Sequence, residues 1–169
     1  MAKQAPAGAV VSLASSNPSV LQVPLTLSVP VSALSASASL SPSFVSADTV
    51  VTITATYAGS ALPVQITIVA PKLISFNLAP TAIGGGGTVT GNVFLSCPAP
   101  TGGEPILLSS SAPLVANPPT SVIVGAGSTS NSFPINTFSV GANMLVTLTA
   151  SDGVSRQTSS LTVEPIALT

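Results

Sequence analysis

The sequence predicts an all-β protein, and three features of the 169-residue chain support that prediction. Charged residues make up only 4% of the chain, so the Glu, Lys and Arg that favour helices are nearly absent, while Val, Ile and Thr are abundant. Hydrophobic residues account for 46%, which is enough to fill a core. The run Leu145–Ala150 largely alternates apolar residues with Thr, as expected of a strand that buries one face.

The chain contains an internal repeat. A shift of 95 residues aligns residues 8–74 with residues 103–169 without a gap and gives 19 identities in 67 positions. This composition would give roughly a tenth by chance, so the similarity indicates a true duplication. As one example, Ser15–Ser16 recurs as Ser110–Ser111.

The second copy contains seven expected strands bounded by turn-forming residues. The first strand ends before Pro80 and the glycine run Gly84–Gly87, and Asp152–Gly153 supplies a tight turn before the last strand. Short strands with turn signals roughly every 8–12 residues indicate a β-sandwich. The expected strands are Leu73–Leu78, Thr88–Leu95, Ile106–Ser110, Ser121–Val124, Ser130–Ile135, Met144–Ser151 and Gln157–Val163.

The first copy carries only the later strands. They are expected at Val10–Ala14, Leu25–Val29, Val50–Tyr57 and Val64–Val69. In the alignment, counterparts of 73–95 would precede Met1, so the first copy lacks its leading strands. Such a sandwich has an unpaired sheet edge and an open core, and both are costly in water.

Two interpretations of the truncated copy remain open at this stage. In the first, the copy is a minimal sandwich that closes on itself, or the chain is a fragment cut at an arbitrary point. In the second, a neighbouring chain supplies the missing strand by adding it to the open sheet.

Five segments of the second copy carry a family resemblance: Gly84–Val93, Ala99–Gly103, Leu108–Pro113, Pro119–Gly127 and Val146–Ser151. Together they resemble the bacterial immunoglobulin-like repeats of large exported surface proteins and of some phage virion proteins. The whole chain is therefore expected to form two tandem immunoglobulin-like β-sandwich repeats. Residues 1–72 would be the incomplete sandwich and residues 73–169 a complete seven-stranded one. For function, the resemblance implies a spacer, an adhesive surface or a decoration.

The charge distribution argues against nucleic acid and membrane as partners. The net charge is −1, and Lys3, Lys72 and Arg156 are scattered, whereas nucleic-acid binding needs clustered cations. No apolar run reaches the roughly 18 residues of a membrane helix. A nearly uncharged, apolar β protein tends to associate, so we expect protein partners, namely a capsid or other coat-protein lattice and sister copies in a homo-oligomeric assembly.

No catalytic, cofactor-binding or metal-binding residue is expected, and so neither enzyme activity nor a cofactor. The chain contains no histidine, which excludes the usual catalytic triads. Its four acidic residues, Asp48, Glu104, Asp152 and Glu164, are spread along the sequence. A calcium site built from Glu104 and Asp152 is conceivable, but solvated turn residues are the preferred interpretation.

The remaining chemically suggestive features have structural interpretations. Gly84–Gly87 lacks the Lys-Ser/Thr of a phosphate-binding loop and is expected to be a flexible connector. Cys97 is the only cysteine and lacks a base to activate it, so we expect a partly buried loop thiol, with an intermolecular disulfide as the alternative. With no Trp and only Tyr57, an aromatic carbohydrate platform is not supported. Four phenylalanines are expected in the core or at an interface: Phe76, Phe94, Phe133 and Phe138.

The sequence favours a virion accessory role, as a phage capsid decoration or cement protein. The chain begins Met-Ala-Lys without an export signal and has the length of a complete small gene product. The alternative is a subunit or fragment of a bacterial cell-surface adhesin or extracellular filament that uses strand complementation. In either role we expect the first copy to be the docking end, with Met1–Pro6 contributing.

Overall fold

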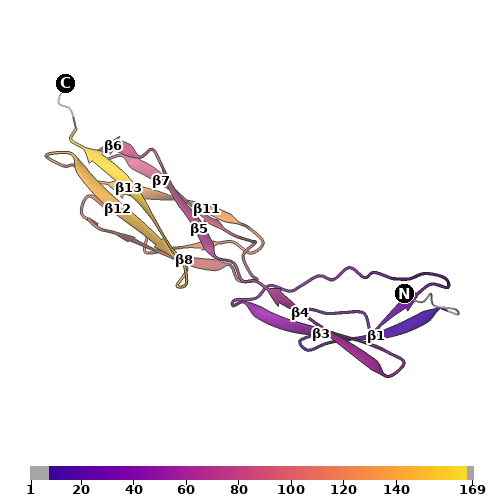
Figure 1. Ribbon diagram of the computed structural model, residues 1–169. Helices are drawn as coiled ribbons and strands as arrows, with labels where there is room; N and C mark the ends of the chain where they lie inside the picture. Colours follow the sequence, from indigo (N-terminus) through magenta and orange to yellow (C-terminus); the bar gives the residue numbers. More distant parts are fainter. Residues whose placement is uncertain (1–7, 167–169) are drawn as a thin grey trace. The chain divides into compact units, whose positions relative to one another are not determined.

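The computed structural model describes residues 8–166, and the chain divides into two compact units, Met1–Ala70 (unit 1) and Pro71–Thr169 (unit 2). The expected contribution of Met1–Pro6 to docking lies outside the described residues. Within 8–166 all regular structure is β (Figure 1). The strands are β1 Ala9–Ser15, β2 Thr26–Val29, β3 Thr49–Tyr57, β4 Ser60–Ile68, β5 Leu73–Ala79, β6 Ala82–Gly84, β7 Thr88–Leu95, β8 Glu104–Ser110, β9 Ala116–Asn117, β10 Ser121–Val124, β11 Ser130–Thr137, β12 Met144–Ser151 and β13 Arg156–Glu164.

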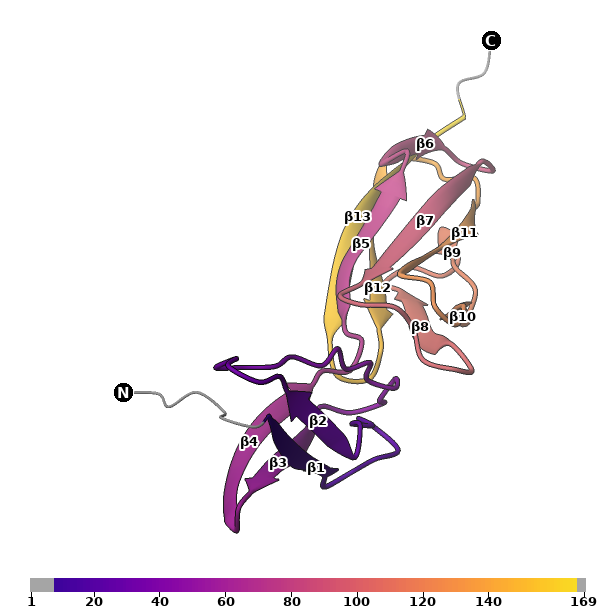
Figure 2. The ribbon, with the colours of Figure 1, turned by 90° about the vertical axis from the view of Figure 1, so that its right-hand side faces the viewer.

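Unit 2 is a two-layered sandwich (Figure 2). One sheet has the strand order β10-β8-β12-β13-β6 and the other β5-β7-β11-β9. All pairs are antiparallel except β6 and β13, which run parallel. Alternate residues of both sheets point inward and form one core, because side chains of a strand alternate between its faces. Its most buried members include Val89, Val93, Ile106, Ile135, Val146, Leu148, Leu161 and Val163.

Unit 2 has two strands that the sequence did not predict, β6 and β9. They contain three and two residues, too few for a periodic pattern to show. Gly84 ends β6, and the rest of the Gly84–Gly87 run connects β6 to β7. A Cβ on Gly85 would lie 2.6 Å from the Phe138 carbonyl oxygen, and one on Gly87 would lie 2.6 Å from Ile83 Cδ1. These two glycines allow close backbone packing beside β6.

Unit 1 contains one antiparallel sheet with the order β2-β1-β3-β4. Its strands occupy the repeat positions of β10, β8, β12 and β13. The hydrogen bonds repeat as well: the Ser16 amide donates to the Thr52 carbonyl at 2.9 Å, and the Ser111 amide donates to the Thr147 carbonyl at the same distance. The duplication found in the sequence is therefore a duplication of this sheet.

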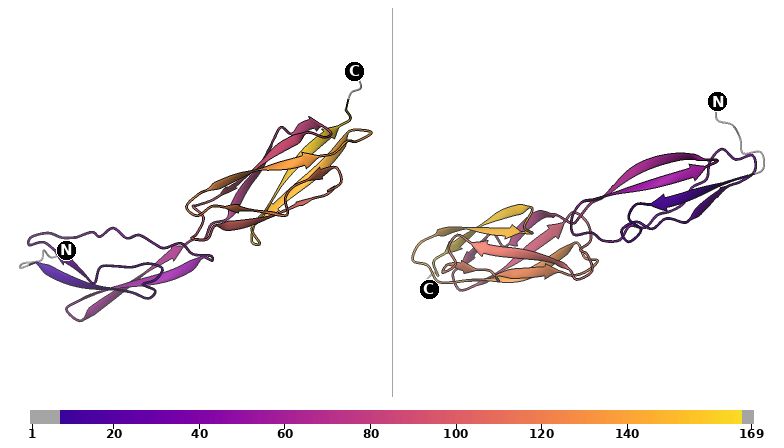
Figure 3. Two further views of the ribbon diagram at one scale, coloured as in Figure 1. Left: turned by 180° about the vertical axis from the view of Figure 1, so that it is seen from behind. Right: turned by 90° about the horizontal axis from the view of Figure 1, so that it is seen from below.

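The second layer of unit 1 is only partly built. The chain from β2 to β3 is irregular (Figure 3) and contains one isolated bridge, between Leu21 and Pro42. This bridge is the repeat counterpart of the pair between Ala116 and Thr137 that joins β9 to β11. Counterparts of β5, β6 and β7 do not occur among residues 8–70. The predicted fold is confirmed: all-β, with tandem immunoglobulin-like sandwich repeats of which the first lacks its leading strands.

No helix suited to spanning a membrane is found in residues 8–166.

Candidate interaction face

The candidate site is the inner face of the unit 1 sheet along β4. Four apolar residues of β4 share this face, because they alternate along the strand, and we call Leu62, Val64, Ile66 and Ile68 the open face. Cross-strand partners lie on the same side of a sheet, and β3 contributes apolar residues here too, with Val64 opposite Ile53. The outward positions of β4 are Pro63, Gln65 and Thr67, so one side of the strand is apolar and the other largely polar.

The open face is much more exposed than its counterpart in unit 2. Leu62 is 68% exposed and Val64 60%, while Ile66 is only partly buried. In unit 2 the counterpart of Ile66 is Leu161, which is completely buried. The same repeat position is thus in a core in one unit and partly in water in the other.

The missing strands explain this difference. In unit 2, β5 packs against β13 and covers its inner face. Strand β4 is the repeat counterpart of β13, but among the described residues of unit 1 nothing corresponds to β5. At roughly 25 cal/mol per Å² of apolar surface, a row of exposed Leu, Val and Ile side chains carries a substantial cost in water.

The part of the sheet farther from β4's outer edge is better covered. Leu21, Val45 and Val51 are buried in unit 1. Leu21 is held by its bridge to Pro42, and the Ser43 amide donates to the Val20 carbonyl at 2.7 Å. Val51 is thus shielded from water, whereas Leu62 and Val64 are exposed.

The open face is also more apolar than its counterpart in β13. Leu62 corresponds to Gln157 and Val64 to Ser159, so two polar positions of the covered sheet are apolar in the uncovered one. In unit 2, Gln157 Nε2 lies 3.5 Å from the Leu73 carbonyl oxygen, a long contact to the covering strand. A surface that stayed in water would favour polar residues at these two positions, not apolar ones.

Charge is nearly absent from unit 1. Asp48 is the only Asp, Glu, Lys or Arg among residues 8–70. Its Oδ1 accepts a hydrogen bond from the Ala70 amide at 2.9 Å, which fixes the end of the unit. Contacts to the open face therefore rest on apolar area and backbone hydrogen bonds and should respond little to salt.

The structure brings Glu104 and Asp152 into electrostatic contact, as the conceivable calcium site requires, but gives Asp152 another role. Asp152 Oδ2 accepts from the Leu73 amide at 2.6 Å, and Oδ1 accepts from the Val154 amide at 2.8 Å and from the Ser155 amide. Partial burial raises the pKa of Asp152, but these hydrogen bonds outweigh it and hold the pKa below its ordinary value. Partial burial and the nearby Asp152 charge raise the pKa of Glu104. Asp152 is a turn and strand anchor.

The other predicted features have clear positions. Phe76 and Phe133 are buried and stack with ring centroids 6.1 Å apart, whereas Phe94 and Phe138 are exposed. The Cys97 thiol is free and partly buried, as expected of the loop thiol.

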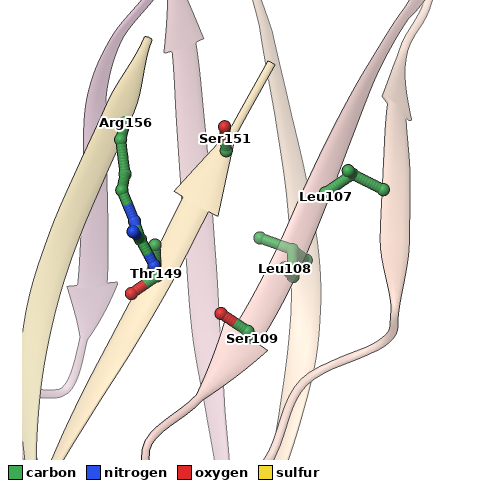
Figure 4. A pocket seen from close by; sticks show the side chains of 6 residues that line it. All are labelled: Leu107, Leu108, Ser109, Thr149, Ser151 and Arg156. Carbon is green, nitrogen blue, oxygen red and sulfur yellow. The ribbon is translucent and has the colours of Figure 1, made fainter. Parts of the chain in front are cut away.

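A shallow pocket on the outer side of β8, β12 and β13 is lined by Leu107, Leu108, Ser109, Thr149, Ser151 and Arg156 (Figure 4). Arg156 is its one ionisable lining residue, so the pocket contains no paired nucleophile and base. Over residues 8–166, no three His, Cys, Asp or Glu side chains gather in a way that could hold a metal ion.

The sequence missed Leu62, the most exposed member of the open face. The predicted strand began at Val64, whereas β4 begins at Ser60 and includes Leu62. Two signals could have found it: the apolar alternation that starts at Leu62, and the Ala58–Gly59 pair between two strand patterns.

No protein family and no curated protein sequence matches this chain. Among solved structures, it is similar to domains 4–9 of surface layer protein SbsC, with 17% identity and a TM-score of 0.40, over 94% of this chain and 22% of that one. It is also similar to the D0-D1 domain of Intimin, with 13% identity and a TM-score of 0.42, over 94% and 82% of the two chains. A third is the BSP domain of a biofilm associated protein, with 14% identity and a TM-score of 0.25, over 99% and 26%. The chain thus spans about a fifth of the first of these structures.

Proposed function

We propose that this chain is a non-enzymatic structural segment of a bacterial cell-surface adhesin or extracellular filament, in which its immunoglobulin-like units act as spacers under tension. The observation that carries the proposal is the parallel pairing of β6 with β13 in unit 2. Strand β13 leads to the C-terminal end of the unit, and β6 follows directly after β5, where the unit begins.

This pairing resists separation of the two ends of unit 2. The Thr162 amide donates to the Thr81 carbonyl and the Gly85 amide donates to the Glu164 carbonyl, each at 2.9 Å. A pull on both ends draws β6 and β13 past each other along their common axis. All bonds of the pair are then loaded together, whereas strands pulled apart from one end break their bonds one at a time.

The surface of the unit 1 sheet suits an extended spacer. The side opposite the open face carries Thr52, Thr54 and Thr56 in a row along β3. Hydroxyl groups hydrate this surface without a long-range field, so neighbouring segments neither attract nor repel one another strongly. A capsid decoration protein gains nothing from a connection that resists shear between the two ends of a unit, so we favour the surface role.

Single-molecule pulling tests the mechanical part of the proposal. In a Cys97→Ser background, one form is attached through cysteines at Pro71 and Pro165, the other at Asn143 and Pro165. The first attachment loads β6 and β13 in shear, and the second unzips β12 from β13, where Met144 lies opposite Val163. We expect a markedly higher unfolding force for the first. Equal forces would contradict a spacer that bears tension.

Labelling of intact cells tests the location. Antibodies raised against unit 2 should bind the producing bacteria without permeabilisation. A signal that appears only after permeabilisation, or only on virus particles, would contradict the surface role.

A further inference from the structure

We infer that unit 1 receives a two-stranded segment from a separate polypeptide, which covers the open face and pairs with residues 35–42. The segment has the chemistry of 73–95: it is uncharged and contains two strands with apolar core-facing residues. This inference goes beyond the proposed function and does not depend on it, since a spacer could keep its open face in water.

The repeat shows what the segment must look like. In unit 2 the inner faces of β12 and β13 are covered by β5, which is paired with β7, and β7 in turn pairs with β11. The counterpart of β11 in unit 1 is residues 35–42. This segment keeps its bridge to Leu21 but, among residues 8–70, has no partner in the place of β7. The missing part is therefore a β5–β7 pair, and residues 35–42 present the edge on which it would be added.

Residues 35–42 have the alternating sequence of a strand that could pair with another strand. Ser and an apolar residue alternate from Ser35 to Leu40, and Ala38 and Leu40 stand at the positions of Phe133 and Ile135, which are buried in unit 2. The bulky Phe133 is thus replaced by Ala. The smaller side chain leaves room for larger residues on an incoming strand.

A second copy of this chain cannot supply the segment by strand exchange. Each copy contains one β5–β7 pair, and that pair already covers the core of its own unit 2. Moving it to unit 1 of a neighbour would expose Val146, Leu148 and Leu161, which are completely buried. Exchange of this pair between two copies is therefore not the source of the cover.

The composition of the open face favours a donor that is not covalently linked. Association costs several kcal/mol in lost translational and rotational freedom, a cost that a covalently joined strand such as β5 does not bear. Leu62 and Val64 replace Gln157 and Ser159 and supply the additional apolar area that offsets this cost. With no charge on the face, the donor needs none either.

The test adds a labelled peptide of residues 72–96 of this chain to the full-length protein. Fluorescence anisotropy should show saturable binding that is insensitive to salt. Amide hydrogen exchange should show protection of residues 35–41 and of β4, with the strands of unit 2 unchanged. A peptide with Phe76→Ser and Val93→Ser, which lacks two core-facing side chains, should not bind.

A pair of matched variants locates the binding surface. Val64 is 60% exposed on the open face, and Val50 is 57% exposed on the opposite side of the same sheet. Val64→Ser should weaken peptide binding about tenfold, the loss expected when a Val side chain is no longer buried, and Val50→Ser should leave it unchanged. Because both side chains are already exposed, neither change should unfold the unit.

Three results would overturn the inference. The first is that the separate peptide does not bind. This includes the case in which the same segment protects unit 1 only when it is joined ahead of Gly8, because the segment that covers the open face would then belong to the same chain. The second is protection confined to unit 2, which would mean exchange with β5–β7. The third is a concentration-dependent dimer that covers the open face and excludes the peptide.

Discussion

At the scale of single residues, Asp152 does more than shape a turn. Its carboxylate accepts hydrogen bonds from two amides of the β12–β13 turn and from the Leu73 amide at the start of β5. One side chain thus joins the two sheets of unit 2 at the point where the unit begins. Hydrogen bonds to a charged acceptor contribute more than neutral ones, although partial exposure reduces their value here.

We expect Asp152→Ala to lower the free energy of unfolding of unit 2 by about 2 kcal/mol, because three backbone amides lose their acceptor. Asp152→Asn keeps one acceptor oxygen and should cost less. The measurement is chemical denaturation followed by hydrogen exchange in β5 and β13. The neighbouring Val154 is 86% exposed, and Val154→Ala serves as the control that should change little. An Ala variant as stable as the wild type would contradict the anchor role.

The pH dependence of the stability of unit 2 follows from two acids, Asp152 and Glu104. The folded-state pKa of Asp152 lies below its ordinary value, so its stabilisation is complete above the unfolded pKa and is lost as pH falls through the folded one. Glu104 has a raised pKa, so its ionisation opposes folding as pH rises through that value. We expect the stability of unit 2 to hold on mild acidification, as Glu104 becomes neutral, and to fall at more acidic pH. Asp152→Asn should remove the acidic fall, and denaturation midpoints across that range test this.

The turn between β3 and β4 contains a strained residue. Ala58 has a φ of 49° and Gly59 a φ of 80°, and positive φ at both central residues is the requirement of a two-residue type I′ hairpin. Positive φ is energetically unfavourable for alanine, whereas Asn adopts it more readily. Ala58→Asn should therefore stabilise the hairpin by about 0.5–1 kcal/mol. Slower amide exchange in β3 and β4 would show the gain, and Gly59→Ala should have the opposite effect.

At the scale of elements, the sequence predicted strands wherever a run was long enough to alternate. Strands β7, β10 and β12 have the predicted bounds because each has apolar residues in register with the core and a clear turn at both ends. Strand β6 was missed because its three residues show no period and its partner, β13, lies far along the chain. Long-range parallel pairing leaves no local signal in a sequence.

The outer edge of β4 contains a proline that limits its pairing with another strand. In unit 2 the Thr162 amide points outward to the Thr81 carbonyl, and Thr162 corresponds to Thr67. Alternate amides of a strand point the same way, so position 63 also faces outward, and Pro63 has no amide hydrogen to offer. Proline at an exposed edge limits pairing with other chains.

We expect Pro63→Thr to increase self-association, because it restores the outward donor that the counterpart Thr158 has in unit 2. Sedimentation velocity at increasing protein concentration measures the effect. Gln65→Thr is the matched control, since position 65 faces the same way and already has its amide. A Pro63→Thr variant that remains as monomeric as the control would show that this edge is protected by other means.

At the scale of the whole molecule, the sequence predicted that the first repeat lacks strands but not which surface this leaves exposed. The 95-residue repeat identified the missing part, because 73–95 has no counterpart in the first copy. It did not show that Val51 is buried while Leu62 and Val64 remain exposed. That outcome depends on how an irregular segment packs, and irregular segments have no periodic pattern from which to predict contacts.

The two units should differ in stability, because they bury very different cores. The core of unit 2 is one continuous cluster between two sheets. In residues 8–70 the buried apolar residues are few: Leu21, Val45, Val51 and Ala70. Since burial of apolar surface dominates folding, we expect β1–β4 to exchange their amides and unfold at a lower denaturant concentration than β5–β13. Hydrogen exchange monitored by mass spectrometry across a denaturant series measures both transitions. Coincident transitions for the two units, without added peptide, would show that the second layer of unit 1 protects its sheet as well as a complete one does.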